Sequence, residues 1–319
     1  MTTIQHISIL VPLYNEEQGF IRMMERLDNL IMHSPEKINV LLIDDGSKDS
    51  TAELIEKSIA GKENYSAIFL SRNFGHPQAL TAGLQEAATL NTDAVFIIDG
   101  DLQDPPELLP IFLQKLREGN DVVYGIRKNR KEGFLKRICY KIYYRLQQRF
   151  SNVNMPLDAG DFSLLTKRVV TQINNLPEES RYIRGLRSWV GYKQAGIEYE
   201  RGERLHGKSK YSLGALLKLA FNGIFNFSEL PIRFIVSAGI ISIGFSLVYL
   251  AITLYKKLVY GTVPEGFTAL IFAIVLFSGV QLLSLGIIGQ YVVRIFFQVK
   301  QRPLFIVKAR ILNGKQVNG

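Results

Sequence analysis

Cysteine is almost absent from this chain of 319 residues, which contains a single one, Cys139. One thiol has no partner within the chain, so a scaffold held by internal disulfides is excluded. A hydrophobic fraction of 47% excludes a disordered protein, and 26 glycines are far fewer than the roughly one third that collagen requires. The length predicts two domains, or one large domain with an appendage.

Charged residues are missing from two long stretches near the C-terminus. Residues 234–254 and 266–293 contain no Asp, Glu, Lys or Arg. Each stretch exceeds the roughly 18 apolar residues that mark a membrane-spanning helix. A buried hairpin of a soluble protein is the alternative, but two such stretches side by side favour two transmembrane helices within residues 233–293.

Acidic residues are absent from residues 294–319, which form a basic tail. The connection between the two stretches has only two basic residues, both lysines. An even number of spans places the tail and the N-terminal part on the same side, and the positive-inside rule places both in the cytosol. Pro12, Glu16 and Glu17 interrupt the first apolar run, so we expect no signal peptide and a large domain that stays cytosolic.

Residues 1–125 alternate short β-rich runs with amphipathic stretches. The expected strands are 7–11, 40–43, 67–70, 94–98 and 121–124. The expected helices are 16–32, 50–59, 77–90 and 105–117. This alternation predicts an α/β fold, a mostly parallel sheet with helices on both faces. Ligands of such open sheets bind at the carboxyl ends of the strands.

Acidic residues gather where the expected strands end. The clusters are Asn15-Glu16, Asp44-Asp45 and Asp99-Gly100-Asp101. Any one cluster could be a turn or a helix cap. Three clusters at one edge repel each other, however, which favours a bound cation or a ligand that offers donors. An Asp-x-Asp loop supplies oxygen ligands for Mg²⁺ or Mn²⁺, completed by substrate phosphates, so the pattern predicts a nucleotide diphosphate ligand.

Basic residues form a second constellation. Its members are Arg72, Arg127, Arg201, Arg204, Lys208 and Lys210. They could bind a second phosphate presented from the lipid side, or contact lipid headgroups. Residues 127–149 carry nine basic residues and one acid, which favours a helix on an anionic membrane surface over nucleic-acid binding or a solvated face. Residues 213–232 predict an interfacial amphipathic helix ahead of the first span.

Residues 202–209 match the phosphate-binding pattern G-x-x-x-x-G-K-[ST] letter for letter. A P-loop joins a buried strand to a helix, whereas the segment before Gly202 is polar and every expected strand comes earlier. Bulky side chains also crowd this loop. The context therefore disfavours an ATP or GTP site, and a membrane-anchored NTPase stays an alternative.

Several motifs, taken together and in order, resemble those of family 2 glycosyltransferases with a GT-A fold. They are residues 11–16, 44–47, 71–75, 99–106 and 207–210. The closer resemblance is to polyprenyl-phosphate glycosyltransferases, which include bactoprenol glucosyltransferases of O-antigen modification and dolichol-phosphate mannose synthases. It covers nearly the whole chain and implies a Rossmann-like GT-A domain over residues 1–212 at the cytosolic face of a bacterial inner membrane.

The resemblance implies a role for each matching residue. The nucleotide sugar would contact Pro12, Tyr14, Glu16, Asp44, Asp45, Arg72 and Asp99. The metal, Mg²⁺ or Mn²⁺, would be held by Asp99, Asp101 and Gln103. The lipid phosphate or the departing diphosphate would contact Arg127, Arg204, Lys208 and Lys210. Asp161 matches the proposed catalytic base, and Asp101 and Asp161 would be the catalytic residues. A lipid phosphate is, however, mostly dianionic at neutral pH and needs little deprotonation. Positioning of the acceptor is therefore the alternative role for Asp161.

The implied reaction is inverting transfer of glucose from UDP-glucose to undecaprenyl or another polyprenyl phosphate, for modification of a cell-surface glycan. His76 and Ser163 stand where many relatives carry Lys and Arg, so N-acetylglucosamine, mannose and an aminoarabinose-type sugar stay open. A processive polysaccharide synthase is disfavoured because the residues before Trp189 do not form Gln-x-x-Arg-Trp. A protein that senses a nucleotide sugar without turnover is a further alternative. We expect no nucleic-acid partner. The chain could also form a homo-oligomer.

Overall fold

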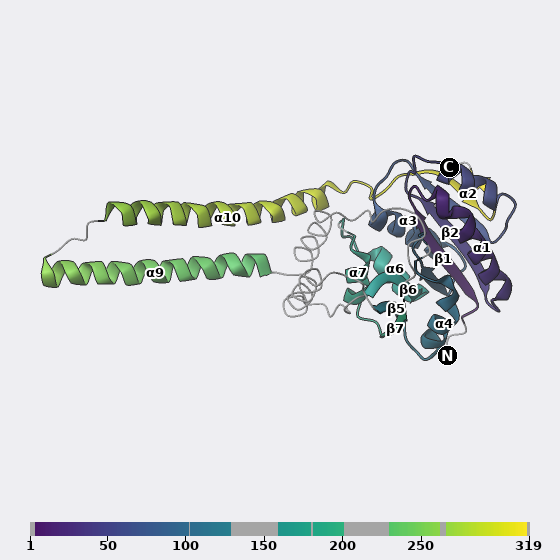
Figure 1. Cartoon of the computed structure of the whole chain (residues 1–319), viewed down its shortest axis with the longest axis horizontal. Coiled ribbons are helices and arrows are strands. Elements are labelled where there is room, and N and C mark those ends of the chain that lie inside the picture. The colour runs from purple at the N-terminus through teal and green to yellow at the C-terminus, as the bar shows by residue number, and fades with distance from the viewer. Residues whose placement is uncertain are drawn as a thin grey trace. The chain divides into compact units, whose positions relative to one another are not determined.

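The computed structural model describes residues 4–101, 103–128, 159–179, 181–200, 230–261 and 266–317. The chain divides into two units. The first contains the sheet and its helices and includes the residues from Arg302 onward. The second contains two long helices, α9 (Leu230–Tyr260) and α10 (Phe267–Lys300) (Figure 1).

Four parallel strands form the centre of the sheet. β1 (His6–Leu13) pairs with β2 (Lys37–Asp44) and with β4 (Ala94–Ile97), and β2 pairs with β3 (Tyr65–Leu70). Nearly all of their residues are buried, as expected for strands covered on both faces. The expected ranges of these four strands are confirmed to within a few residues at each end.

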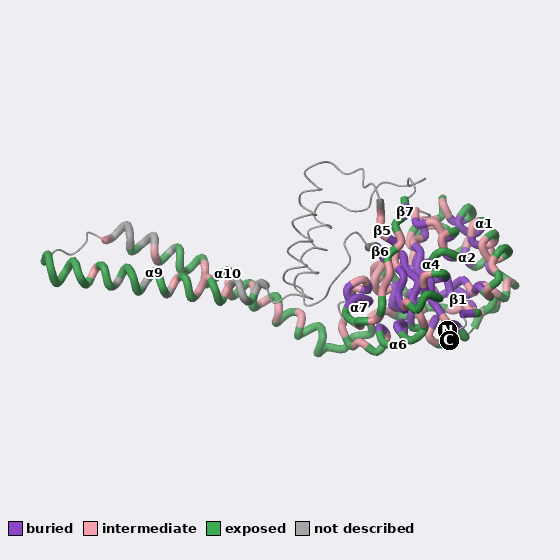
Figure 2. The backbone as a smooth tube through the Cα atoms, turned by 90° about the horizontal axis from the view of Figure 1, so that it is seen from below, coloured by how far each residue is buried: buried purple, intermediate pink, exposed green. Residues whose placement is uncertain are grey.

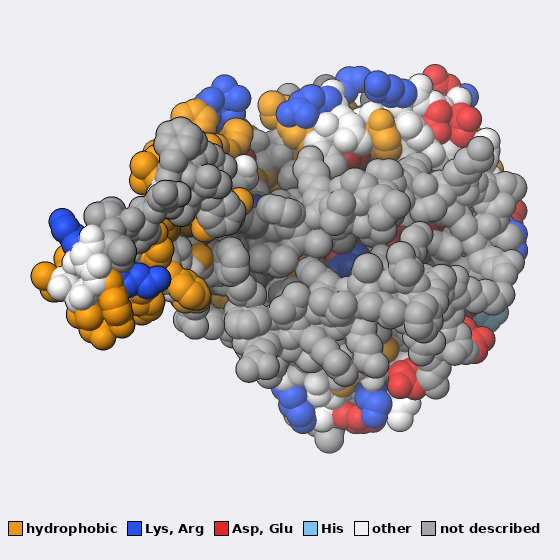
Figure 3. All heavy atoms as spheres, turned by 60° about the vertical axis from the view of Figure 1, so that its left-hand side comes forward, with side chains coloured by type: hydrophobic (Ala, Val, Ile, Leu, Met, Phe, Trp, Pro, Cys, Tyr) orange, Lys and Arg blue, Asp and Glu red, His pale blue; other side chains and the backbone are white. Residues whose placement is uncertain are grey.

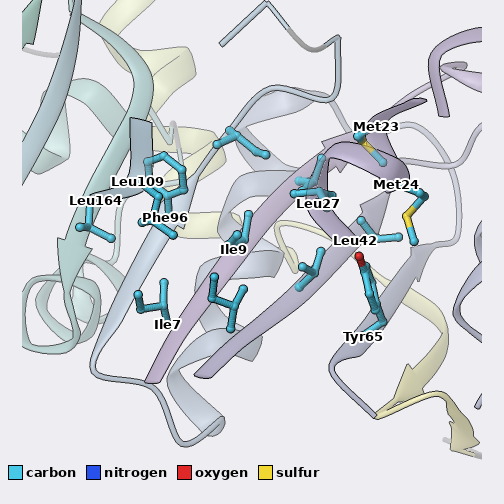
Figure 4. Packing of buried hydrophobic residues seen from close by; sticks show 14 of the residues in the cluster. Ile7, Ile9, Met23, Met24, Leu27, Leu42, Tyr65, Phe96, Leu109 and Leu164 are labelled. Carbon is cyan, nitrogen blue, oxygen red and sulfur yellow. The ribbon is translucent and has the colours of Figure 1, made fainter. Parts of the chain in front are cut away.

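Helices cover both faces of this half of the sheet. They are α1 (Glu17–His33), α2 (Thr51–Ile59), α3 (His76–Thr89), the 3₁₀ helix η1 (Pro106–Leu108) and α4 (Leu109–Arg117). Ile9 of β1 belongs to the hydrophobic cluster that contains Leu27 of α1 (Figure 4). The neighbouring Leu10 points to the other face, where a Cβ added to Gly83 of α3 would lie 3.3 Å from it. The period-2 alternation of β1 thus packs α1 and α3 on opposite sides.

The other half of the sheet is mixed. β6 (Ala159–Thr166) lies antiparallel between β4 and β5 (Val122–Lys128), and β7 (Gln194–Glu200) pairs in parallel with β5 at the edge. The helices α6 (Lys167–Asn175) and α7 (Ile183–Trp189) belong to this half. Neither β6 nor β7 is among the expected strands. In this half only β6 runs against the central strands, because β5 and β7 point the same way as β4, so the expected mostly parallel sheet is confirmed.

Strand β7 changes the context of the phosphate-binding match. It includes residues 198–200 and ends two residues before Gly202, so the expectation that every sheet strand comes earlier than this polar segment is wrong. β7 is nevertheless an edge strand with most residues exposed or half-buried, because Ile197 and Tyr199 alternate with charged residues. A P-loop follows a buried strand, so the fold still disfavours one. Residues 202–209 themselves lie outside the described residues.

The C-terminal residues return to the sheet. β8 (Val307–Leu312) pairs antiparallel with β3, and β9 (Lys315–Val317) pairs with β8. Gly314 has a φ of 71°, and its N–H donates to the Tyr65 carbonyl at 2.9 Å. The treatment of residues 294–319 as a separate tail is therefore corrected, because their last part covers the edge that β3 would otherwise leave open.

The second unit consists of two apolar helices. Ile235–Tyr260 has a mean hydropathy of 2.2 and Leu276–Lys300 one of 1.6, and both are long and apolar enough to cross a membrane. Figure 2 shows exposed and half-buried residues along both helices, and Figure 3 shows hydrophobic side chains on their surface. The expected basic helix over 127–149 and the expected interfacial helix over 213–232 lie outside the described residues, apart from a few residues at their ends.

Candidate active site

The carboxyl ends of β1, β2 and β4 bring the three acidic clusters to one edge of the sheet. The Asp45 N–H donates to the Leu13 carbonyl at 2.9 Å, and the Ile98 N–H donates to the Leu10 carbonyl at 3.1 Å. Gly100 lies so close to β1 that a Cβ would stand 2.5 Å from the Leu13 side chain. Parallel pairing thus places the clusters together, as the sequence predicts.

The loop after β1 rests on the start of α2. Asn15 adopts a φ of 52°, in the left-handed region that Asn tolerates better than most residues. The Glu16 N–H donates to Thr51 Oγ1 at 2.9 Å. Pro12 is buried in β1, and Tyr14 and Glu16 are half-buried at its end. The three residues assigned to the nucleoside therefore lie at the site edge.

Asp44 and Asp45 bind the protein's own backbone. The two carboxylate oxygens of Asp45 accept from the N–H groups of Phe74 and Gly75 at 2.8 and 2.9 Å. Asp44 accepts from the Ser47 N–H at 3.2 Å. Burial raises the pKa of both carboxyl groups, and these hydrogen bonds act in the opposite direction. This pair shapes the loops around the site.

The basic residues assigned to the site are described only in part. The Arg72 guanidinium lies 4.0 Å from the centre of the Phe74 ring, and its Nη1 donates to the Asn73 carbonyl at 3.0 Å. Arg72 is exposed and is therefore open to a ligand. Arg204, Lys208 and Lys210 lie outside the described residues.

Asp99 and Asp101 lie in a loop crowded with negative charge after β4. Burial, followed by the charge of Asp104, raises the pKa of Asp99 to about 6. Asp101 Oδ1 accepts from the Gln103 N–H at 3.1 Å. Among the described residues, no group of three or more His, Cys, Asp or Glu side chains is arranged to hold a metal ion by itself. Two carboxylates and an amide side chain fit Mg²⁺ or Mn²⁺ when diphosphate oxygens complete the coordination.

Asp161 on β6 is paired with Arg184 of α7 and lies close to His76 of α3. Arg184 Nε and Nη2 donate to its two oxygens at 3.0 and 2.8 Å. His76 Nε2 lies 3.5 Å from Asp161 Oδ2 and 3.8 Å from Asp99 Oδ1. Burial raises the pKa of Asp161, but the Arg184 charge and the hydrogen bonds from His76 and Arg184 outweigh it and hold the pKa well below its usual range. Asp161 is therefore a fixed anion close to the loop of Asp99 and Asp101.

Arg127 at the end of β5 is engaged with a buried carboxylate. Its Nη2 lies 3.9 Å from Asp104 Oδ2, and its Nε donates to the Tyr199 hydroxyl at 3.4 Å. A Cβ added to Gly160 would lie 3.1 Å from Arg127 Nη2, which places the guanidinium beside the residue that precedes Asp161. Arg127 thus lies close to Asp161, and its contact with a phosphate stays a prediction.

Sequence reasoning missed Arg184, Arg187 and Tyr199. Arg187 is 1% exposed, and its Nη1 donates to the Gly160 carbonyl at 3.2 Å. Burial lowers the pKa of Arg187 to about 10. Two signals were present in the sequence. The arginines are spaced i, i+3 and so share one helix face, and apolar residues alternate with glutamates from 197 to 200, as in an edge strand.

The chain is similar to known proteins in sequence and in structure. The sequence profile described as "Glycosyl transferase family 2" matches residues 8–173. "Uncharacterized glycosyltransferase YkcC" of Bacillus subtilis (strain 168) is 41% identical over 302 residues, covering 94% of this chain and 93% of that protein. "Bactoprenol glucosyl transferase" of Shigella phage SfII is 36% identical over 303 residues, covering 95% of this chain and 97% of that protein.

A third relative, "Prophage bactoprenol glucosyl transferase homolog" of Escherichia coli (strain K12), is 33% identical and covers 95% of this chain and 98% of that protein. Among solved structures, glucosyl-3-phosphoglycerate synthase from Mycobacterium tuberculosis with UDP matches 69% of this chain and 79% of that chain, with 17% identity and a TM-score of 0.46.

The fold, the acidic edge and the relatives define a glycosyltransferase with a GT-A fold. The chain belongs to glycosyl transferase family 2.

Proposed function

We propose that this protein transfers glucose from UDP-glucose to undecaprenyl phosphate, with inversion at the sugar, at the cytosolic face of the bacterial inner membrane. The observation that carries the reaction class is the carboxylate loop of Asp99 and Asp101, which crowds negative charge at the carboxyl edge of the sheet. The acceptor and the sugar are supported by the names of relatives that this chain matches over 95% of its length.

The donor lies along the ends of β1, β2 and β4 in this proposal. Pro12, Tyr14 and Glu16 contact the nucleoside, and Arg72 contacts the diphosphate. Asp44 and Asp45 act on the donor through the loops that they hold. Asp99, Asp101 and Gln103 hold the Mg²⁺ or Mn²⁺ ion, which supplies countercharge for the departing diphosphate.

The acceptor phosphate approaches from the side of Asp161 and Arg127. A phosphate monoester with a second pKa near 6 is mostly dianionic at neutral pH and attacks without help from a strong base. Asp161, whose two oxygens accept from Arg184, serves as a fixed anion that orients the cations around the acceptor. Arg127 binds the phosphate, and we extend that role to Arg204, Lys208 and Lys210.

The return of the chain to the sheet supports the proposed membrane topology. β8 follows α10 in the sequence and pairs with β3, which precedes α9. The segments before and after the two helices therefore belong to one folded unit, which supports their placement on one side of the membrane. If both segments lie on one side, the chain between them crosses the membrane an even number of times. The basic residues beyond α10 favour the cytosol for that side.

A transfer assay tests the proposal. Detergent-purified protein is given undecaprenyl phosphate, Mg²⁺ or Mn²⁺, and one labelled nucleotide sugar at a time, and label extracted into lipid is counted. We expect metal-dependent labelling from UDP-glucose. Labelling from another donor would correct the sugar, and donor binding without labelling from any donor would replace the enzyme by a nucleotide-sugar sensor.

A further inference from the structure

Asp104 is a buried carboxylate in the same loop as the proposed metal ligands. It follows Asp101 by three residues, and its side chain is fully buried. A carboxylate taken out of water is tolerated only when other groups supply hydrogen bonds and countercharge. The groups that do so for Asp104 therefore also fix the position of the loop.

Those groups come from the far edge of the sheet. The Tyr199 hydroxyl donates to Asp104 Oδ1 at 2.5 Å, and Arg127 Nη2 lies 3.9 Å from Asp104 Oδ2. Tyr199 and Arg127 are register partners on the paired strands β7 and β5. The edge strand β7 and its neighbour β5 thus present a hydroxyl and a guanidinium to the loop that follows β4.

Tight packing fixes the Tyr199 ring. Its centre lies 5.1 Å from that of Phe162, in an edge-to-face arrangement. A Cβ added to Gly125 would lie 2.6 Å from the Tyr199 ring and 2.6 Å from the Phe162 ring. Tyr199 thus contacts both the loop of Asp104 and the residue next to Asp161, so it fixes the loop relative to β6.

We propose that Tyr199 is a positioning residue for the divalent cation. Its hydroxyl holds Asp104, and Asp104 holds the loop of Asp99, Asp101 and Gln103 in the geometry that binds the cation with the nucleoside diphosphate. This inference rests on the proposed function. Loss of a hydrogen bond one step away from a metal ligand typically weakens metal binding by about 10- to 100-fold.

The chain offers a matched control in the other half of the sheet. The Tyr65 hydroxyl donates to Asp28 at 2.7 Å, and Lys62 Nζ donates to the same carboxylate at 2.9 Å. Tyr65 on β3 is 0% exposed and Tyr199 on β7 is 5% exposed, so both are buried. Tyr65→Phe and Tyr199→Phe therefore each remove one hydrogen bond from a phenol to a carboxylate that also has a basic partner nearby. Tyr65→Phe leaves the loop of Asp99, Asp101 and Gln103 untouched.

Binding of Mn²⁺ in the presence of UDP tests the inference without turnover. Free Mn²⁺ is measured by electron paramagnetic resonance with the full-length protein in detergent. We expect Tyr199→Phe to weaken Mn²⁺ binding about tenfold or more and Tyr65→Phe to change it less than about twofold. Unfolding midpoints should fall by similar amounts in both variants, because each loses one buried hydrogen bond.

Asp104→Asn provides a second variant that keeps the side-chain size. We expect it to weaken Mn²⁺ binding, and Tyr199→Phe to add little in its background, because the two groups act as one unit. Mn²⁺ binding by Tyr199→Phe equal to that of the wild type would overturn this inference alone. Absence of Mn²⁺ binding by the wild type in the presence of UDP would overturn the proposed function as well.

Discussion

Two pairs of acidic residues stand at the same edge of the sheet, and their surroundings differ. The carboxylates of Asp44 and Asp45, after β2, accept hydrogen bonds from backbone N–H groups of nearby loops. Asp99, after β4, lies among like charges, and burial with the charge of Asp104 raises its pKa to about 6. Similar residues at equivalent strand ends therefore differ in role. Asp44 and Asp45 hold loops, and Asp99 lies in an excess of negative charge that a bound cation would relieve.

The largest expected effect is loss of a carboxylate from the charged pair. Asp101→Asn keeps the size of the side chain but removes a proposed metal ligand, so we expect lipid labelling to fall about 10³-fold or more. The measurement is the initial rate of label transfer at saturating metal. Unchanged circular dichroism controls for folding, and a variant that keeps a tenth of the wild-type rate would contradict the assignment.

A smaller loss is expected at Asp161. Asp161→Asn removes a fixed anion but changes no residue of the loop that carries Asp99, Asp101 and Gln103. Misplacement of the acceptor should lower the transfer rate about 10²-fold. The rate is compared with that of Asp101→Asn in one assay series. Equal and complete loss in both variants would refute a role limited to positioning.

Asp45→Asn tests the loop-building pair. An amide accepts through one oxygen only, so one of the hydrogen bonds from Phe74 and Gly75 is lost. We expect the free energy of unfolding to fall by about 1–3 kcal/mol and the KM for the nucleotide sugar to rise more than the KM for the lipid. Activity lost as fully as in Asp101→Asn, with unchanged stability, would erase the difference between the two pairs.

The smallest effect is expected for an ion pair away from the site. Arg117 Nη2 donates to Glu36 Oε1 at 2.6 Å. Although burial raises the pKa of Glu36, hydrogen bonds from Ser34 and Arg117 bring it below its ordinary 4.5. This contribution to stability is therefore present above pH 4.5 and lost as the pH falls further.

Arg117→Gln should cost about 0.5 kcal/mol at pH 7 and leave transfer unchanged. Unfolding in urea at pH 7 and pH 4 measures it, and the difference from the wild type should shrink at the lower pH. A transfer defect in this variant would show that loss of an ion pair outside the site is enough to impair activity.

The sequence predicted the half of the site that parallel strands build. Apolar runs of strand length end in acidic clusters, and parallel pairing of the strands brings these ends together at one edge of the sheet. The positions of the strands in the sequence are therefore enough to predict that the clusters lie together. The clusters at Asp45 and Asp99 were found in this way. The two strands β1 and β2 pair over their full length, and their register places Leu13 opposite Asp44.

The other half depends on contacts between distant residues. Arg184 reaches Asp161 across 23 residues, and Tyr199 reaches Asp104 across 95. Local sequence can place Arg184 on a helix face and Tyr199 in an edge strand, but it does not identify the partner of either residue, because each pairing exists only once β6 and β7 have joined the sheet. The strand after α10 was missed for a similar reason, since β8 pairs with a segment more than 200 residues earlier.

Release of UDP from UDP-glucose tests the central claim most directly. It is measured with undecaprenyl phosphate, with undecaprenol, which lacks the phosphate, and with no lipid, each with and without Mn²⁺. The account predicts metal-dependent UDP release only with undecaprenyl phosphate, in amounts equal to the glucose recovered in lipid. Equal release with undecaprenol or without lipid would contradict the claim that a lipid phosphate is the acceptor.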